Sequence, residues 1–351
     1  MFRSDIVYKL IIVLPVIVLF PLNLHAWARH NLITKYAIQN NESDINSVMV
    51  VTEISPDDSI NPEYAPIYTN PDFKNNKVDC NKFINYDLDS GWYEGFEGKE
   101  PVAATTALEV LINFSDEPDW GMDKNLNLSF AQKFMAGSQG YRHMYYPAWS
   151  FHLPFIFIPQ GEAPERAEHF FKRALMEYRK GNLYASYREL ARSMHYIMDM
   201  GQPFHTFQLP VKLINKRSPF NGTVQAIKNY HFAYETFVAN ILQMEDCGNA
   251  EIFRDDIANA KSMPADSAGA LAIKVAISSS KMAHNLIPLC MDVFGEWLNS
   301  EKRQALTGEE FEKIISKQTP EIDKLHVLTA EALKLTSEGA RGLIMLFEKL
   351  R

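Results

Sequence analysis

Cysteine is scarce in this sequence, and its spacing excludes the common cysteine-based sites. The 351 residues include only Cys80, Cys247 and Cys290. An odd number at such wide spacing forms neither a zinc-ribbon pattern nor a paired-cysteine redox motif. One disulfide with one remaining thiol is compatible with the count, and the sequence does not identify the pair. Cysteine chemistry therefore gives no indication of what the protein does.

Long apolar runs are also rare, and the one exception lies near the start. Residues 10–22 (LIIVLPVIVLFPL) form an apolar run of 13 residues that follows two basic residues. A membrane-spanning helix needs about 20 apolar residues, so this run is short for one. The next residues offer a cleavage site after Ala26. The pattern predicts a signal peptide over residues 1–26, a mature N-terminus at Trp27 and a secreted or periplasmic protein; an uncleaved membrane anchor is the alternative.

Positive charge is in deficit. The formal net charge is −8, and the first 26 residues carry +1, so the remainder carries −9. An acidic body repels polyphosphate unless bound cations reverse the local field. The balance therefore disfavours a stable nucleic-acid partner and is compatible with a metalloenzyme. Apolar residues at 46% and charged residues at 22% are ordinary for a globular protein.

Strand-like alternation and internal repeats are absent from the sequence, and helical spacing dominates. It occurs over residues 27–39, 102–114, 166–180, 183–200, 230–244, 268–298, 309–316 and 322–350. Residues 42–101 differ, because they hold five prolines among many Asn and Asp residues and no long periodic run. We expect one all-α domain over residues 27–351, a multi-helix bundle with a loop-rich insertion near residues 42–101.

Histidine and carboxylate side chains recur at helical spacing on two of these helices. His195 and Asp199 are four residues apart, and His205 follows a Gly-Gln-Pro break; His231 and Glu235 repeat the spacing. One such pair is usually a solvated helix pair or a capping contact. Two pairs on two helices instead favour a metal site built between facing helices. Imidazole and carboxylate ligands with few thiols suit zinc.

These segments resemble a known family. HYIMDMGQPFH, beginning at His195, and YHFAYETF, beginning at Tyr230, are similar to the paired metal motifs of the zinc-dependent phospholipase C family and of its relatives, the single-strand-specific zinc nucleases. The resemblance is strong over residues 143–237 and faint over 42–101. The ending TSEGARGLIMLFEKL is also similar to the final helix of the family.

The resemblance implies three Zn²⁺ ions at the bottom of a cleft. The implied ligands are the amine and carbonyl of Trp27, with His30, Asp119, His143, His195, Asp199, His205, His231 and Glu235. Asp199 would bridge two ions. The loop aspartate that joins His143 and His195 is favoured to be Asp119 over Asp116, and either is a candidate to orient the attacking water or accept its proton. Trp27 and His30 are closer together than in the compact phospholipases, and the 42–101 insertion has no clear counterpart.

The resemblance implies hydrolysis of phosphodiester bonds by in-line displacement. Phospholipid at a membrane surface, cut to diacylglycerol and a phosphorylated head group, is the favoured substrate because Glu235 matches the phospholipases, whereas the nucleases tend to carry Asp. The aromatic segment 145–159 would form either an apolar rim or part of the core. A zinc nuclease and a non-catalytic exported binding protein on the same scaffold remain alternatives. We expect a monomer.

Overall fold

The computed structural model describes residues 29–39, 48–50, 103–120, 140–148, 158–209, 221–244, 248–300, 302 and 306–351. Within these ranges the protein is a bundle of helices with one two-stranded antiparallel sheet. The expected all-α class is therefore confirmed. The signal peptide, Trp27 and the insertion beyond residues 48–50 fall outside the described residues. No helix in the described ranges has both the length and the apolar character needed to cross a bilayer.

The elements follow one another along the chain as a series of helices interrupted by short extended and 3-10 segments. They are α2 (His30–Ile38), β1 (Val48–Val50), β2 (Ala104–Thr106), α5 (Ala107–Phe114), the 3-10 turn η4 (Glu117–Trp120), α7 (Ala163–Arg179), α8 (Leu183–Asp199), α9 (Pro203–Thr206), α10 (Asn221–Gln243), α11 (Gly248–Ala258), α12 (Ala268–Phe294), η7 (Glu296–Asn299), α13 (Gly308–Ile315) and α14 (Pro320–Leu350).

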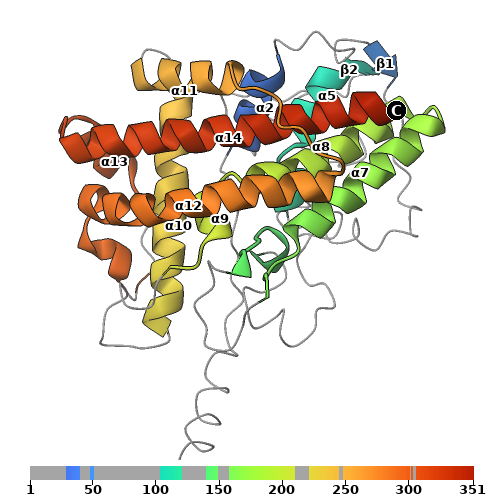
Figure 1. Ribbon diagram of the computed structural model, residues 1–351. Coiled ribbons are helices and arrows are strands. Elements are labelled where there is room, and N and C mark those ends of the chain that lie inside the picture. Colours follow the sequence, from blue (N-terminus) through green and yellow to red (C-terminus); the bar gives the residue numbers. More distant parts are fainter. Residues whose placement is uncertain are drawn as a thin grey trace, which may run out of the picture.

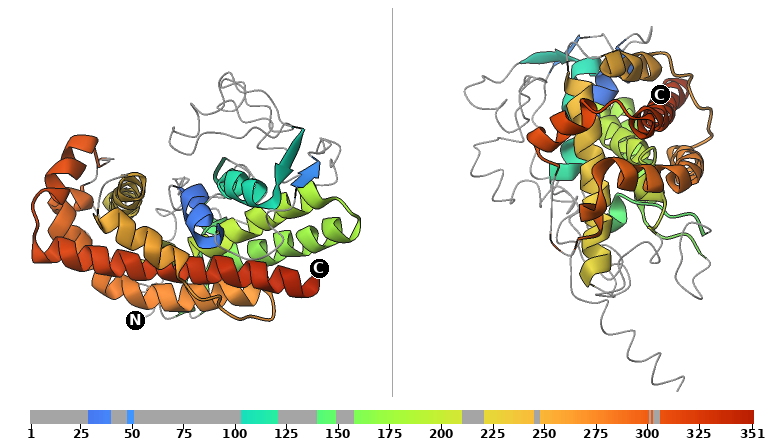
Figure 2. Two further views of the ribbon diagram at one scale, coloured as in Figure 1. Left: turned by 90° about the horizontal axis from the view of Figure 1, so that it is seen from above. Right: turned by 90° about the vertical axis from the view of Figure 1, so that its left-hand side faces the viewer.

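Two helix pairs form the frame of the bundle. α7 and α8 form a hairpin in which Gly181, at φ 83°, makes the left-handed turn between them. α12 and α14 lie side by side, and both pack on α7 and α8. Figure 2 shows α12 and α14 along one edge, with α10 and α11 at one end and α7 and α8 at the other. In Figure 1 α10 crosses behind this pair. α8 therefore lies in the interior, covered by helices from both halves of the chain.

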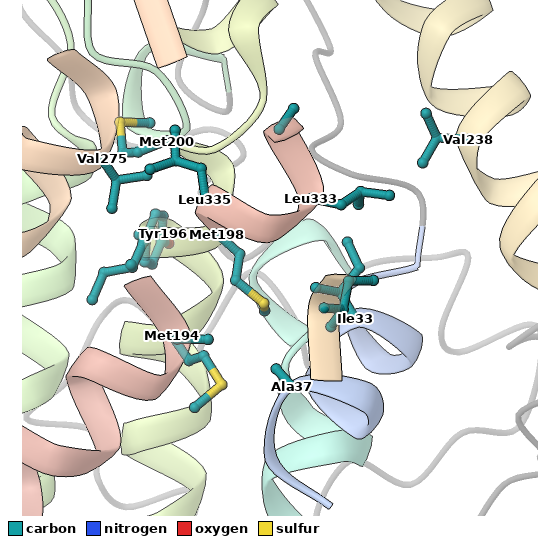
Figure 3. Packing of buried hydrophobic residues seen from close by; sticks show 14 of the residues in the cluster. Ile33, Ala37, Met194, Tyr196, Met198, Met200, Val238, Val275, Leu333 and Leu335 are labelled. Carbon is teal, nitrogen blue, oxygen red and sulfur yellow. The ribbon is translucent and has the colours of Figure 1, made fainter. Parts of the chain in front are cut away.

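The apolar residues of α8 hold it against three neighbouring helices. Its apolar residues pack against α2, α12 and α14, as Figure 3 shows. Thr34 of α2 donates its hydroxyl to the sulfur atoms of Met194 and Met198, at 3.7 and 3.6 Å. Full burial of one such apolar side chain stabilises the fold by about 1.5–3 kcal/mol. This packing fixes α2 against α8, with His30 at the start of α2.

Several predicted helix boundaries are wrong. The helix expected over 102–114 begins at Ala107, because residues 104–106 instead form β2, which pairs antiparallel with β1. Thr106 ends the strand and caps the helix: its hydroxyl accepts from the backbone N–H of Glu109, whose carboxylate accepts from the N–H of Thr106. This reciprocal cap fixes where the helix starts. α10 also begins earlier than expected, at Asn221, and α11 was not predicted as a separate helix.

The end of α8 lies close against a neighbouring helix, and a glycine makes this close approach possible. Gly201 lies against α14, so closely that a Cβ atom there would be 1.9 Å from Oγ1 and 2.9 Å from the Cα of Thr336. Its carbonyl accepts a 3.0 Å hydrogen bond from the hydroxyl of Ser279 on α12. The turn that leads into α9 is therefore held by both helices of the α12–α14 pair.

We expect Gly201→Ala to destabilise the fold by about 1–3 kcal/mol, because the backbone of α14 would have to shift to admit the methyl group. Urea unfolding followed by circular dichroism measures the change. Gly308→Ala is the matched control: no atom lies within 4 Å of a Cβ at that position, at the start of exposed α13. Equal stability of the two variants would contradict the close packing of α8 on α14.

Candidate metal centre

The side chains predicted as ligands converge around the C-terminal end of α8. His195 and Asp199 lie one turn apart on the buried face of that helix, and both are fully buried. α9 follows after three residues, and the Gln202 side chain caps it by accepting from the backbone N–H of Phe204. This short helix places His205 beside α8. Four other segments, α2, η4, 140–148 and α10, bring the remaining groups to the same point.

Four side chains surround one position. The ring nitrogen Nε2 of His195 lies 3.0 Å from Nδ1 of His143, 3.4 Å from Oδ2 of Asp199 and 3.8 Å from Oδ1 of Asp119. Nδ1 of His143 lies 3.0 Å from the same Asp199 oxygen and 3.6 Å from the same Asp119 oxygen. Donor atoms on a tetrahedral zinc ion with bonds near 2.0–2.1 Å are about 3.3 Å apart. These four atoms, which we name the α8 set, have that spacing.

Three side chains surround a second position. Nε2 of His205 lies 2.9 Å from Nε2 of His231, which lies 2.6 Å from Oε1 of Glu235. The distance from His205 Nε2 to the same Glu235 oxygen is 3.8 Å. We name these three residues the α10 set. Gln202 donates its side-chain amide to Glu235 at 3.3 Å, which orients the carboxylate. Three protein ligands are the usual complement of a catalytic zinc site, which keeps a position for water or substrate.

Another predicted ligand, His30, lies beside Asp199 and packs against the ring of His195, with the ring centroids 4.1 Å apart. Its Nε2 is 3.2 Å from Oδ1 of Asp199, while Oδ2 of Asp199 belongs to the α8 set. The two carboxylate oxygens thus face two different positions, the arrangement that a bridging ligand requires. Among the described residues, Nδ1 of His30 is buried without a hydrogen-bond partner, and Nε2 of His30 and Oδ1 of Asp199 have no well-aligned hydrogen bond besides their 3.2 Å ion-pair contact. Buried polar atoms of this kind call for an explanation, and a cation between them supplies one.

Backbone carbonyls orient two of the histidines. Nδ1 of His195 lies 2.7 Å from the carbonyl oxygen of Ser115, and Nδ1 of His205 lies 2.5 Å from the carbonyl oxygen of His143. An N–H at Nδ1 that donates to a carbonyl leaves the Nε2 lone pair directed at the centre. Histidine ligands of metals almost always have such an outer partner. The donor set, its spacing and its outer contacts therefore fit zinc.

The charges at the centre are the second reason to expect a cation. Burial raises the pKa of the Asp119 carboxyl to about 7 and holds the pKa of Glu235 well above its usual range. Burial also holds the pKa of His195 well below its usual range, so its imidazole is neutral at physiological pH. Neutral imidazole is the form that binds metal, and a bound cation stabilises the ionised carboxylates that are otherwise costly to bury.

The structure separates the two loop aspartates, both of which lie in or beside η4. Asp119 contributes an oxygen to the α8 set. Asp116 instead accepts a 3.2 Å hydrogen bond from the backbone N–H of Asn31, whereas one oxygen of each aspartate lies 3.8 Å from Nδ1 of His30. Their side chains, 14% and 11% exposed, are more accessible than those of the other residues at the centre. Asp119 is therefore the loop aspartate that lies among the candidate ligands, with Asp116 beside it.

Several residues that shape the centre were not predicted from the sequence. Glu117 lies between the two aspartates and is fully buried against two α8 arginines, Arg188 and Arg192. Burial opposes its ionisation, but the two guanidinium groups lower its pKa to about 2. Two arginines four residues apart on an otherwise buried helix face were the available signal. The carbonyl of Ser115 left none, because every residue has one.

Comparison with known proteins gives little further guidance. No protein-family model and no curated protein matches the chain. Among solved structures it is similar to the alpha toxin of Clostridium absonum, at 14% identity over 70% of this chain and with a TM-score of 0.34. It is also similar to an alpha-toxin from an avian strain of Clostridium perfringens, at 16% identity over 69% and 0.31. The alignment covers 55% of each toxin chain, so this chain spans about half the toxins' length.

Asp119→Asn and Asp116→Asn distinguish the two loop carboxylates. We expect Asp119→Asn to lower the zinc content by about one ion per chain, because the α8 set loses its fourth donor. Asp116→Asn keeps the same shape and should retain the zinc content of the unaltered protein. Elemental analysis after dialysis against buffered zinc measures both. The reverse result would show that Asp116, not Asp119, is the loop ligand.

Proposed function

We propose that this protein is an exported zinc-dependent phosphodiesterase whose substrate is a phospholipid. The observation that carries the proposal is the close approach of the α8 set and the α10 set: Nδ1 of His205 lies 4.0 Å from Oδ1 of Asp199. The sequence resemblance to the zinc-dependent phospholipase C family supports the same reaction. Fold alone would not, because one helical scaffold can host many activities.

The chain's own residues divide the work of such a reaction. The two sets, with His30, would hold three zinc ions, which when bound polarise phosphoryl oxygens and make water acidic enough to lose a proton near neutral pH. Asp116, outside both sets and partly exposed, is the candidate to orient the attacking water and accept its proton. The N–H of Asn31 holds this carboxylate in place. No covalent intermediate with the protein is required.

Support for a lipid substrate comes from Glu235 and from the acidic body. Glu235 is the residue type that the phospholipases of the family tend to carry at this position. The net charge of −8 disfavours a polyanionic substrate that extends over the surface. The aromatic segment 145–159 gives mixed support: Tyr146 is buried and pairs with Gln160, whereas residues 149–157 fall outside the described ranges.

The reaction is tested by comparing the unaltered protein, on several substrates, with a variant that lacks one candidate zinc ligand. We expect zinc-loaded protein to release the phosphorylated head group from phosphatidylcholine vesicles, and a strong chelator to abolish this release. His195→Ala should lower the rate at least about 100-fold, because it removes a ligand of the α8 set. His169→Ala, at an exposed position on α7, is the matched control.

Each alternative has its own result in the same experiment. Cleavage of single-stranded nucleic acid without release of any head group would favour the nuclease. Protein that binds zinc but turns over neither substrate would favour a non-catalytic binding protein. Full activity of His195→Ala would contradict the site assignment.

The proposal also includes Trp27 as a ligand, and the donor count around His30 supports it. The α8 set uses one oxygen of Asp199 and the available nitrogen of His195, so among the described residues a third ion on the Nε2 side of His30 would have two remaining donors, His30 Nε2 and Asp199 Oδ1. Zinc usually takes four. Trp27 precedes His30 by three residues, and a mature N-terminus there would add an amine and a carbonyl.

We therefore expect active protein from a secreting host to begin at Trp27. N-terminal sequencing checks the start, and elemental analysis compares its zinc content with that of a chain extended by one alanine before Trp27. The extended chain should hold about one zinc ion fewer, because the extension moves the free amine away from the centre. Equal zinc content in the two chains would rule out the N-terminal ligand.

A further inference from the structure

The turn that carries the two loop aspartates is attached to α8 by a buried ion-pair network. Glu117 accepts from Nε of Arg192 at 2.8 Å and from Nε of Arg188 at 3.1 Å, both at Oε2, and Nη2 of Arg188 binds Oε1. All three side chains are fully buried. A two-oxygen contact with two guanidinium groups fixes the direction of a carboxylate as well as its position.

The arginines and the ligands occupy one face of α8. Arg188, Arg192, His195 and Asp199 are spaced by four, three and four residues, so their side chains project from the same side of the helix. Successive residues of the 115–120 turn contact successive side chains on this face of α8. Glu117 binds the arginines, the Ser115 carbonyl meets Nδ1 of His195, and the Asp119 carboxylate lies 3.8 Å from Nε2 of the same histidine.

We propose that Glu117 is a positioning residue for the metal centre: its ion pairs with Arg188 and Arg192 set the place of the turn along α8, and with it the place of Asp119 and of the Ser115 carbonyl. The inference rests on the proposed function, because it assumes that the α8 set binds zinc. It assigns no contact between Glu117 and metal or substrate. Glu117 acts on the centre only through its neighbours in the turn.

The alternative is that these ion pairs only stabilise the fold, as a buried network of this kind would. The two roles differ in which zinc ion is affected. A positioning role concerns the α8 set, which includes Asp119 and His195, and leaves the α10 set unchanged, because His231 and Glu235 come from a different helix. General destabilisation would weaken both sets together.

Zinc titration of metal-free Glu117→Gln against a chromophoric chelator tests the positioning role without any measurement of activity. We expect the affinity of the α8 set to fall about 10- to 100-fold, because a displaced turn would remove the Ser115 carbonyl from His195, and losing such a partner of a ligand usually has this effect. The most similar variant within the network is Glu189→Gln. Glu189 is also buried and lies 3.4 Å from Nη1 of Arg192 and 3.1 Å from Nε of Arg173, but it belongs to α8 and not to the turn. This control should keep all of its zinc affinity while breaking a buried ion pair.

A double variant separates stability from positioning if Glu117→Gln folds poorly. Glu117→Gln leaves two buried arginines without their carboxylate, and Glu117→Gln with Arg188→Met removes one of those uncompensated charges. Replacing buried ion pairs by apolar side chains often restores stability. We expect the double variant to regain the unfolding midpoint of Glu189→Gln but not the zinc affinity of the α8 set. Recovery of both properties together would overturn the positioning role.

The wild-type titration distinguishes this inference from the proposed function. Wild-type protein that binds zinc in both sets, alongside Glu117→Gln with unchanged affinities, would overturn the positioning role and leave the proposed function intact. Wild-type protein that binds no zinc would overturn both.

Discussion

Charge buried along one face of α8 is the constraint on which the rest of the structure depends. Arginine, histidine and aspartate side chains on a buried helix face are costly unless each meets a partner. The partners come from distant parts of the chain: Glu117 meets the arginines, the Ser115 carbonyl meets His195, and His30 and His143 meet Asp199. α2, η4 and residues 140–148 are therefore brought to this face by polar contacts as well as by the apolar core.

The helices of the fold were largely predictable, and their exact limits were less so. α7, α8, α12 and α14 have long apolar faces that repeat with the helical period, so the sequence placed them within a few residues. The boundary at Ala107 was missed because Thr106 ends a strand and caps a helix, and the strand exists only where β1 pairs with it. Such pairing depends on residues more than fifty positions apart, which local periodicity does not report.

The centre was predictable where its geometry follows from helix spacing and was not where it follows from tertiary contact. His195 with Asp199, and His231 with Glu235, are brought together by one turn of helix. The acidic turn 115–120 is different, because Asp116, Glu117 and Asp119 have similar chemistry within four positions. Glu117 pairs with the arginines on α8, Asp119 lies beside the histidines, and Asp116 accepts from the backbone N–H of Asn31 at the start of α2. These contacts exist only in the folded structure, so the sequence alone does not assign them.

Asp199 gives the centre a further property under the proposed function, because one carboxylate would serve two ions. The α8 set brings four donor atoms together, whereas, among the described residues, Nε2 of His30 and Oδ1 of Asp199 form a separate close pair. An ion in the α8 set would bind Oδ2 and hold the carboxylate in one orientation, so Oδ1 would already face His30 before the second ion arrives. The conformational entropy of the Asp199 carboxylate would then be lost only when the first ion binds. Binding of each ion would therefore favour binding of the other by the same factor. The position of the turn that carries Asp119 would thus affect an ion that it does not itself bind.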